Sequence, residues 1–429
     1  MDNKVKFEKE ISSIGYYGVA VLGGGPAGVC AAIEAARNGA KTVLIEGTGM
    51  LGGMATSGMV GPFMTNYDRE GERPVVGGLF REICERLEKI GGAILPENAE
   101  APSIHTSFIG PYHKHVTPFD SFLLQTVLDE MVTEAGVHTL LYTRFADAVT
   151  ENGKIKSVIV AALEGLRAVS ADVFIDCTGN ADVAEAAGVP TWKGEEGSGV
   201  PQPGTLMFEV DNVDDARYTE RPKHHPVKAY RTPKENTYKV NHFHVFNTDS
   251  TNSESMTKAH MEARKQVIDA YRVLHDETPG FENCKISGVA PVLGVRESRH
   301  IEGKYKIKVE DVSSGKKFED RIAAYAFGMD VHPRNPEMTG NFKIQVAQVY
   351  YIPYRSMLPI SCENLLVAGK TVSCESQAAG GLRVMPCAMS MGQAAGAAAS
   401  IALKNGVSLE NVPTDKLHSL LLSHGAILD

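Results

Sequence analysis

The sequence predicts an α/β fold in which helices cover a central parallel sheet and an α+β unit is inserted into the chain. Continuous apolar runs alternate with helical segments up to residue 176, which is typical of parallel strands buried on both faces. The alternation stops near Gly204, where short strands and one long helix follow, and it returns after Ile344. A chain of 429 residues has room for two or three such units. We expect a first part at 15–204, an inserted unit at 205–344 and a last part at 345–429.

The first part reads strand, glycine turn, helix and strand. Apolar residues at 19–22 predict a strand, residues 27–38 a helix, and residues 41–45 the next strand. The elements expected after these are helices at 79–90 and 120–135 and strands at 137–142, 155–161 and 173–176.

The inserted unit and the last part differ in their pattern of expected strands and helices. In the inserted unit we expect strands at 205–210, 305–312 and 325–328 and an amphipathic helix at 254–274. In the last part we expect a strand at 365–368 and a long helix at 386–403. The small residues of that helix indicate tight helix packing rather than chemistry; they include Ala394, Ala395, Gly396 and Ala397.

A glycine motif lies where the first strand meets the first helix. Gly23, Gly25 and Gly28 satisfy G-x-G-x-x-G, with Pro26 and Ala27 between the last two, and Glu46 lies 18 residues further on. Such a motif gives a tight turn, a close approach of backbone to a pyrophosphate and close helix–strand packing, while the acid accepts from ribose hydroxyls. The sequence therefore predicts a Rossmann-like dinucleotide site. The acid disfavours NADP, and the choice between FAD and NAD stays open at this point.

Further motifs occur in a fixed order along nearly the whole chain. With these motifs the chain resembles the FAD-dependent oxidoreductase family of the glutathione-reductase-like superfamily, whose nearer relatives include fumarate-reductase-like flavoproteins. The resemblance implies an FAD-binding domain, an inserted substrate domain and an oxidoreductase activity. The matching segments are 19–46, 51–58, 76–80, 176–182, 294–299, 352–356, 366–369, 381–386 and 391–396.

The resemblance also implies which residues contact FAD. The turn after residue 51 is expected at the flavin and its phosphates, and the turn after Asp176 near the adenosine half. The helix that begins at Pro386 is expected to direct its positive end at the pyrimidine edge of the flavin, with Arg383 adding charge there or holding substrate. The residues implied in addition to the glycine motif are Gly47, Gly52, Gly53, Met54, Thr56, Ser57, Thr178, Gly179, Gly369, Lys370, Arg383, Val384 and Met385.

Composition restricts the partners. The net charge of −9 without a long basic run disfavours nucleic acid. The charged start lacks a signal peptide, and residues 388–403 are too short for a membrane span. Seven scattered Cys without a C-x-x-C pair predict a reducing, cytoplasmic location and neither disulfides nor an iron–sulfur cluster. A second G-x-G-x-x-G is absent, so a complete NAD(P)H domain is not expected. The electron donor or acceptor stays open, and the sequence is compatible with a homo-oligomer.

The catalytic residues are less well defined by the sequence. Arg296 and Arg299 are candidates to bind a carboxylate, or else to pair with Glu297 or Glu302. His332 and either Tyr351 or Tyr354 are candidate proton donors. His242 with His244, and His113 with His115, form possible metal half-sites without a suitable third ligand, so no metal is expected. A basic run is interpreted as a solvated face or as a guide for an anionic substrate; it comprises Arg217, Arg221, Lys223, Lys228, Arg231, Lys234 and Lys239.

The leading hypothesis is an FAD-dependent dehydrogenase, reductase or oxidase. It would transfer a hydride between a small organic substrate, with carboxylates among the candidates, and N5 of the flavin. Two alternatives are a flavoprotein that modifies transfer RNA, which the acidic charge disfavours, and a flavin-binding protein without a redox role.

Overall fold

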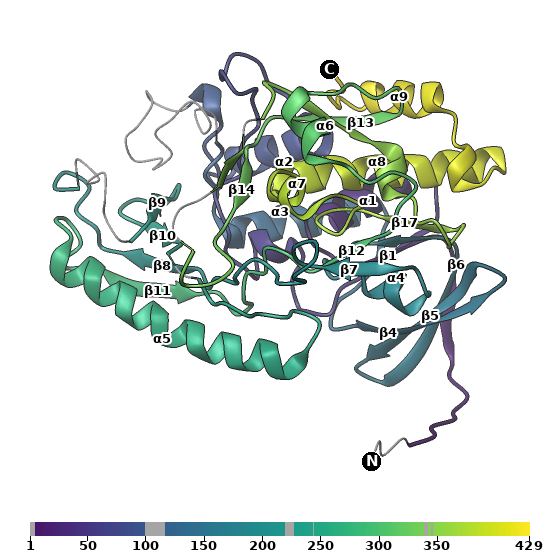
Figure 1. Cartoon of the computed structure of the whole chain (residues 1–429), viewed down its shortest axis with the longest axis horizontal. Coiled ribbons are helices and arrows are strands. Elements are labelled where there is room, and N and C mark those ends of the chain that lie inside the picture. The colour runs from purple at the N-terminus through teal and green to yellow at the C-terminus, as the bar shows by residue number, and fades with distance from the viewer. Residues whose placement is uncertain (1–4, 99–115, 219–226, 243, 339–341, 345) are drawn as a thin grey trace.

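The computed structural model describes residues 5–98, 116–218, 227–242, 244–338, 342–344 and 346–429. Within these residues, a seven-stranded sheet lies at the centre of the larger part (Figure 1). Its strand order is β3-β2-β1-β6-β5-β4, and β17 pairs with β6 beside this path. The pairs β3–β2, β2–β1, β1–β6 and β6–β17 are parallel. The pairs β6–β5 and β5–β4 are antiparallel. The strands are β1 Ser13–Leu22, β2 Thr42–Ile45, β3 His138–Leu140, β4 Arg144–Glu151, β5 Lys154–Ala162, β6 Gly165–Asp176 and β17 Leu365–Val367.

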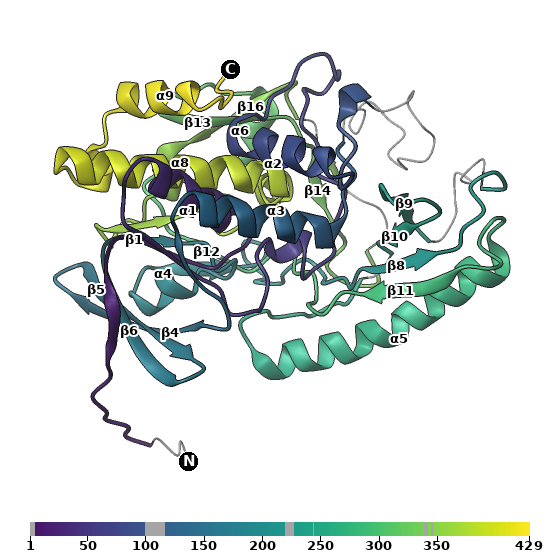
Figure 2. The ribbon, with the colours of Figure 1, turned by 180° about the vertical axis from the view of Figure 1, so that it is seen from behind.

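The helices α1 (Pro26–Arg37) and α8 (Met385–Asn405) pack closely against each other beside this sheet. A Cβ at Gly392 would lie 2.0 Å from the carbonyl oxygen of Ala27, and one at Gly396 would lie 2.3 Å from that of Ala31. The prediction that the small residues of α8 serve helix packing is confirmed. Figures 1 and 2 show further helices grouped with α1 and α8 on one side of the sheet: α2 Gly78–Lys89, α3 Ser121–Glu134 and α9 Thr414–Ser423.

The inserted unit has a sheet of its own, in the order β11-β8-β10-β9, which α5 (Ser253–Glu277) covers. Buried residues recur along one face of α5, at Ala259, Ala263, Val267, Ala270 and Leu274, so this face packs on the sheet. Buried side chains from residues 206–293 form a separate apolar core. The strands are β8 Phe208–Asp211, β9 Ala229–Arg231, β10 Tyr238–Val240 and β11 Lys285–Val289.

Short elements connect the two parts. Buried side chains between 307 and 352 belong to the core of the larger part, although the sequence assigns many of them to the inserted unit. The three-part division stays a prediction. The elements are α4 Asp182–Ala186, β7 Thr191–Lys193 paired with β12 Arg299–Ile301, α6 Val309–Ser314, β13 Arg321–Tyr325 paired with β16 Tyr350–Pro353, β14 Met329–Val331 paired with β15 Phe342–Ile344, and α7 Ser376–Leu382.

Two predicted strands of the inserted unit were wrong. Residues 305–312 alternate apolar and charged residues, but the segment turns into α6 because the Asp311 carboxylate accepts from the backbone N–H of Lys308 at 2.9 Å. Gly315, in the left-handed conformation, ends that helix. Residues 325–328 mostly connect β13 to β14. The strand β4 was missed because it is an edge strand that buries none of its side chains fully.

Across the described ranges, no helix has both the length and the apolar character that crossing a membrane requires.

Candidate functional site

The glycine motif forms the turn between β1 and α1, and two of its glycines are required by packing. Gly23 has a φ of +99°, and a Cβ there would lie 2.4 Å from the carbonyl oxygen of Cys177. A Cβ at Gly28 would lie 1.8 Å from the carbonyl oxygen of Gly23. These two residues therefore have to be glycine for the chain to fold, whether or not a ligand binds.

Gly25 is glycine for another reason. Its φ of −71° and ψ of −173° are accessible to any residue, and a Cβ there would meet no described atom within 4 Å. It precedes Pro26 at the start of α1, where no side-chain cap and no acidic residue occupies the first turn. Free N–H groups and the positive end of the helix dipole face that open space. This geometry fits a pyrophosphate, which needs the backbone to come close.

Glu46 directly follows β2, beside this turn. Its two carboxylate oxygens accept from the backbone N–H groups of Gly24 and Thr48, both at 2.7 Å, and each oxygen keeps a further lone pair for a ribose hydroxyl. The backbone of Tyr142 donates to the Thr48 carbonyl at 3.0 Å. Tyr142 has a φ of +52°, and Arg144 lies next to Gly47. The sequence did not predict Tyr142 or Arg144 at this site, because only the pairing of β2 with β3 brings them to this edge of the sheet.

The turn that contains Gly52 and Gly53 lies against the glycine motif. Gly52 donates to the carbonyl of Gly24 at 2.8 Å, and a Cβ at Gly53 would lie 2.9 Å from the Cα of Gly25. The next two hydroxyls differ in role. Thr56 donates its hydroxyl to the Leu51 carbonyl, whereas the buried Ser57 Oγ has no hydrogen-bond partner among the described residues. Ser57 is thus the better fit for a ligand contact, and Met54 lies in the same turn.

A second turn, after β6, closes the site from the other side. Asp176 accepts from the backbone and hydroxyl of Thr178, which fixes this turn, and Gly179 follows with a φ of +76°. Gly369 follows β17, and a Cβ added there would lie 3.4 Å from the side chain of Ala27. The next residue, Lys370, is buried and donates to the carbonyl of Val295 at 2.9 Å. Burial lowers the pKa of Lys370 to about 8. Lys370 therefore connects the glycine motif with the segment that contains Arg296.

A cluster of buried and half-buried charged and polar side chains brings that segment together with β14 and with the end of α7. Arg383 donates through Nη2 to both the carbonyl and the Oδ2 of Asp330, each at 2.9 Å. Asp330 Oδ2 is also 3.0 Å from Nε2 of His332, whose Nδ1 is 2.8 Å from Nε2 of His244. Figure 1 shows β14 between α7 and the sheet of the inserted unit. Val384 and Met385 begin α8 directly after Arg383.

Arg296 is the charged group of this cluster that has no acidic partner. Its side chain is buried, its Nη1 donates to the carbonyl of Pro203 at 2.7 Å, and it makes no ion pair with any described residue. Arg299, by contrast, pairs with Asp182 at 3.0 Å and Glu185 at 3.6 Å. The alternative hypothesis, that either arginine pairs with Glu297 or Glu302, is wrong among the described residues: Glu297 pairs with Arg334 at 2.6 Å, and Arg299 pairs with Asp182 and Glu185.

The charges of the cluster leave an excess of positive charge. Burial lowers the pKa of Arg296 to about 9, with the Arg383 charge acting in the same direction, so Arg296 stays protonated at neutral pH. Burial lowers the pKa of His332 to about 3 and that of His244 to about 4, and Arg296 adds to both shifts. Burial acts to raise the pKa of Asp330, but His332 and the two guanidiniums hold it below its ordinary value. One carboxylate, two neutral imidazoles and two guanidiniums favour an anionic ligand.

Open space also lies next to this cluster. Among the glycines in the described part of the chain, Gly25 and Gly328 alone combine a φ outside the left-handed region with no atom within 4 Å of an added Cβ. Gly328 is two residues before Asp330. We interpret both positions as places where the backbone comes close to a ligand.

Other candidate residues do not join the cluster. Tyr351 lies beneath the ammonium of Lys317, 5.7 Å from its ring centre, and Tyr354 donates to the carbonyl of Leu409. In the basic run, Arg217, Arg231 and Lys234 pair with Glu282, Asp215 and Asp120, and Lys239 is buried. Arg221, Lys223, His113 and His115 lie outside the described residues. In the described ranges, no three His, Cys, Asp or Glu side chains form a group that could hold a metal ion.

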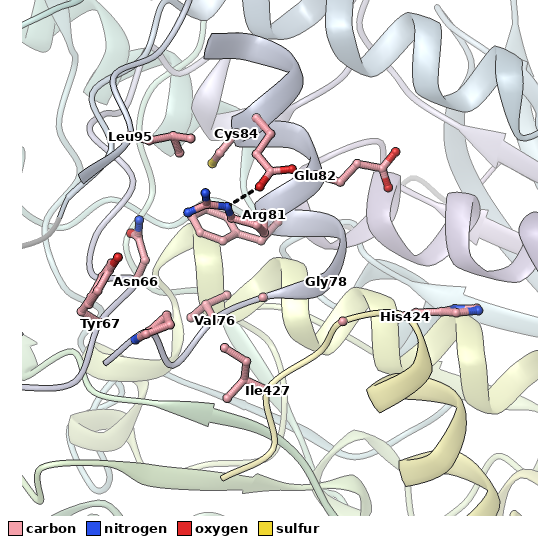
Figure 3. Close-up of a pocket in the computed structure, with 15 residues that line it drawn as sticks. Asn66, Tyr67, Val76, Gly78, Arg81, Glu82, Cys84, Leu95, His424 and Ile427 are labelled. Carbon is pink, nitrogen blue, oxygen red and sulfur yellow. Dashed lines mark hydrogen bonds and ion pairs between the residues drawn. The ribbon is translucent and has the colours of Figure 1, made fainter. Parts of the chain in front are cut away.

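A pocket of about 400 Å³ between α2 and the C-terminal residues is separate from these groups (Figure 3). None of the predicted site residues lines it. Arg81, at the centre of the view, is already paired with Glu85 at 2.7 Å and with Glu97. The charge of Arg81 is therefore compensated, and we do not assign the candidate functional site to this pocket.

Comparisons with known proteins identify the family of the chain and a similar fold. A family model described as FAD dependent oxidoreductase matches residues 18–421. No curated protein matches the sequence. A solved triple mutant of the flavin-dependent brominase Bmp2 is similar in fold, with a TM-score of 0.50 and 13% identity over 95% of this chain and 84% of that one.

Two further solved structures are less similar. A geranylgeranyl bacteriochlorophyll reductase-like protein from Thermoplasma acidophilum has a TM-score of 0.48 and 15% identity over 96% of this chain and 84% of that one. The p-nitrophenol 4-monooxygenase PnpA from Pseudomonas putida DLL-E4 has a TM-score of 0.46 and 12% identity over 97% and 85% of the two chains.

Proposed function

The chain belongs to the FAD-dependent oxidoreductase family, and from this premise we propose that it transfers a hydride between a small, carboxylate-bearing organic substrate and N5 of the flavin. It is an enzyme that uses FAD. When bound, FAD supplies the hydride acceptor or donor. One observation supports the substrate class above all: Arg296 is a buried guanidinium without an acidic partner among the described residues, next to Arg383.

The residues of the glycine motif and Glu46 would hold the pyrophosphate and the ribose. The Gly52–Gly53 turn, Ser57 and the start of α8 would meet the flavin end. A substrate carboxylate would pair with Arg296, because an uncompensated buried charge is costly and an anion removes that cost. The inserted unit would close the substrate side through His244, which keeps water away from the reacting atoms.

The experiment that tests the proposal is an anaerobic screen for flavin bleaching. The FAD-loaded protein is mixed with small carboxylates and with alcohols and amines that lack a carboxylate, and the oxidised flavin absorbance is followed. We expect bleaching by a compound that carries both a carboxylate and an oxidisable C–H bond, and none by its methyl ester. Equal bleaching by acid and ester would overturn the substrate class. In the reverse direction, we expect photoreduced enzyme to transfer the hydride back to the oxidised product.

Arg383 gives a separate prediction about the flavin itself. Replacing Arg383 by alanine is expected to lower the two-electron midpoint potential by about 30–60 mV, because a hydrogen bond to a charged group is worth about 1.5–3 kcal/mol and about 30 mV corresponds to about 1.4 kcal/mol. The potential is measured by equilibration with a reference dye. Arg355→Ala is the control, since Arg355 pairs with Asp320 on the half-exposed surface. An unchanged potential in Arg383→Ala would show that this guanidinium does not stabilise the reduced flavin.

A further inference from the structure

Three side chains form a hydrogen-bonded chain whose proton positions can be deduced. A carboxylate only accepts hydrogen bonds, so Nε2 of His332 must donate to Oδ2 of Asp330 across 3.0 Å. In a neutral imidazole the other nitrogen then carries a lone pair. Nδ1 of His332 therefore accepts from Nε2 of His244 across 2.8 Å, and Nδ1 of His244 is left with a lone pair.

We propose that His244 is the catalytic acid–base residue and that His332 and Asp330 position it. We call these three residues the histidine relay. The inference rests on the proposed function and names the group that handles the proton in that reaction. His332 is not free for this task, because both of its ring nitrogens are engaged and its side chain is only 12% exposed. His244 is half-buried and lies on the inserted unit, at the open end of the relay.

The proton balance of the step follows from the relay. In the oxidative direction a substrate H–C–X–H loses a hydride from carbon to FAD and a proton from X, so that a C=X bond forms. Nδ1 of His244 takes that proton, and its Nε2–H passes to Nδ1 of His332. His332 then holds two protons and a positive charge. The hydrogen bond and charge of Asp330 act to raise the pKa of His332, whereas burial and Arg296 lower it, and a carboxylate on Arg296 would remove part of that opposition. The reductive direction reverses each transfer.

The charges around His244 make its basicity depend on substrate. Burial first, and then Arg296, Lys228 and His242, lower the pKa of His244 to about 4, while Asp330 acts to raise it. A substrate carboxylate paired with Arg296 would cancel the charge that acts most strongly among these groups. His244 would then become a stronger base only when substrate is bound. In the free enzyme its imidazole would stay neutral. Gln202 supports the relay, since its side-chain oxygen accepts from the backbone N–H of His332 at 3.1 Å.

The first test needs no substrate. Long-range 1H–15N spectra of the FAD-loaded protein, labelled with 15N-histidine, report the protonated nitrogen of each ring; His244→Gln and His332→Gln assign the signals. At pH 7 we expect both rings to be neutral and protonated on Nε2. A proton on Nδ1 of either ring, or a charged His332 in the free enzyme, would overturn the proposed hydrogen-bond order.

The second test is the anaerobic rate of flavin reduction with the substrate found by the bleaching screen. His244→Ala is expected to lower that rate by about 10²–10⁴-fold, and added imidazole is expected to restore part of it, because the lost group is a proton acceptor at a half-buried position. His332→Gln should lower the rate at neutral pH and move the acid limb of the pH profile to lower pH, without rescue by imidazole. His275→Gln, on the surface beside Asp276, is the control.

The outcomes separate this inference from the proposed function. If a carboxylate substrate bleaches the flavin and His244→Ala reduces at the wild-type rate, the relay is wrong and the oxidoreductase function stands. If no compound bleaches the flavin, the proposed function fails, and the ring spectra still decide the hydrogen-bond order. A loss in His244→Ala that follows loss of FAD, seen as a falling flavin absorbance, would also overturn a catalytic role.

Discussion

Replacing Gly25 by valine is expected to leave the protein folded and free of FAD. The backbone at Gly25 suits any residue, and a Cβ there meets no described atom within 4 Å, so the folded chain has open space where the valine side chain begins. A bound pyrophosphate has to occupy that room, so FAD content is expected to fall from about one per chain to less than about a tenth. The measurement is the ratio of flavin to protein absorbance after saturation with FAD and gel filtration.

A glycine that packing requires provides the control for this prediction. At Gly392 a Cβ would lie 2.0 Å from the carbonyl oxygen of Ala27, so Gly392→Val is expected to separate α8 from α1 and to destabilise the fold by about 3 kcal/mol or more. Its apo form should melt well below that of Gly25→Val, whose apo form should melt close to the wild type. A Gly25→Val protein that retains stoichiometric FAD would refute the placement of the pyrophosphate.

Replacing Arg296 by methionine is expected to weaken strongly both the binding of a carboxylate substrate and the reduction of the flavin by it. Loss of one partner from a buried, hydrogen-bonded charge pair costs about 2–5 kcal/mol, which corresponds to about 30-fold to several thousand-fold in the rate of flavin reduction divided by the substrate dissociation constant. Methionine keeps a long apolar side chain in the same space. The quantity is measured by anaerobic stopped flow with the carboxylate substrate found by the bleaching screen.

Arg299 is the matched control, three residues away on the same segment. Because its guanidinium is already paired with Asp182 and Glu185, Arg299→Met is expected to lower the free energy of unfolding by about 1 kcal/mol and to leave substrate binding nearly unchanged. The ion pair is partly exposed, which keeps that loss small. Equal losses of substrate binding in Arg296→Met and Arg299→Met would remove Arg296 from the substrate site.

Much of the fold could be predicted because its patterns are local. The strand, glycine turn and helix at the start of the chain are set by neighbouring residues, and the structure begins α1 at Pro26 as the pattern indicates. The long helices α5 and α8 were found for the same reason. The edge strand β4 was not predicted, since an exposed strand has no buried face to give an apolar pattern. The short helix α6 was predicted as a strand, because the alternation of apolar and charged residues there had less influence than the capping carboxylate of Asp311.

The sequence by itself determined the nucleotide end of the site: a glycine motif, an acid at the end of the next strand, and the order of motifs that matches a flavoprotein family. Only the tertiary structure decided the reacting end. It separated Arg296 from Arg299 and joined His332 to Asp330, Arg383 and His244. The sequence offered His244 only as half of a metal site that lacks a third ligand. The physical reason is that a turn depends on consecutive residues, whereas the charge and protonation of a buried side chain depend on which distant segments pack around it.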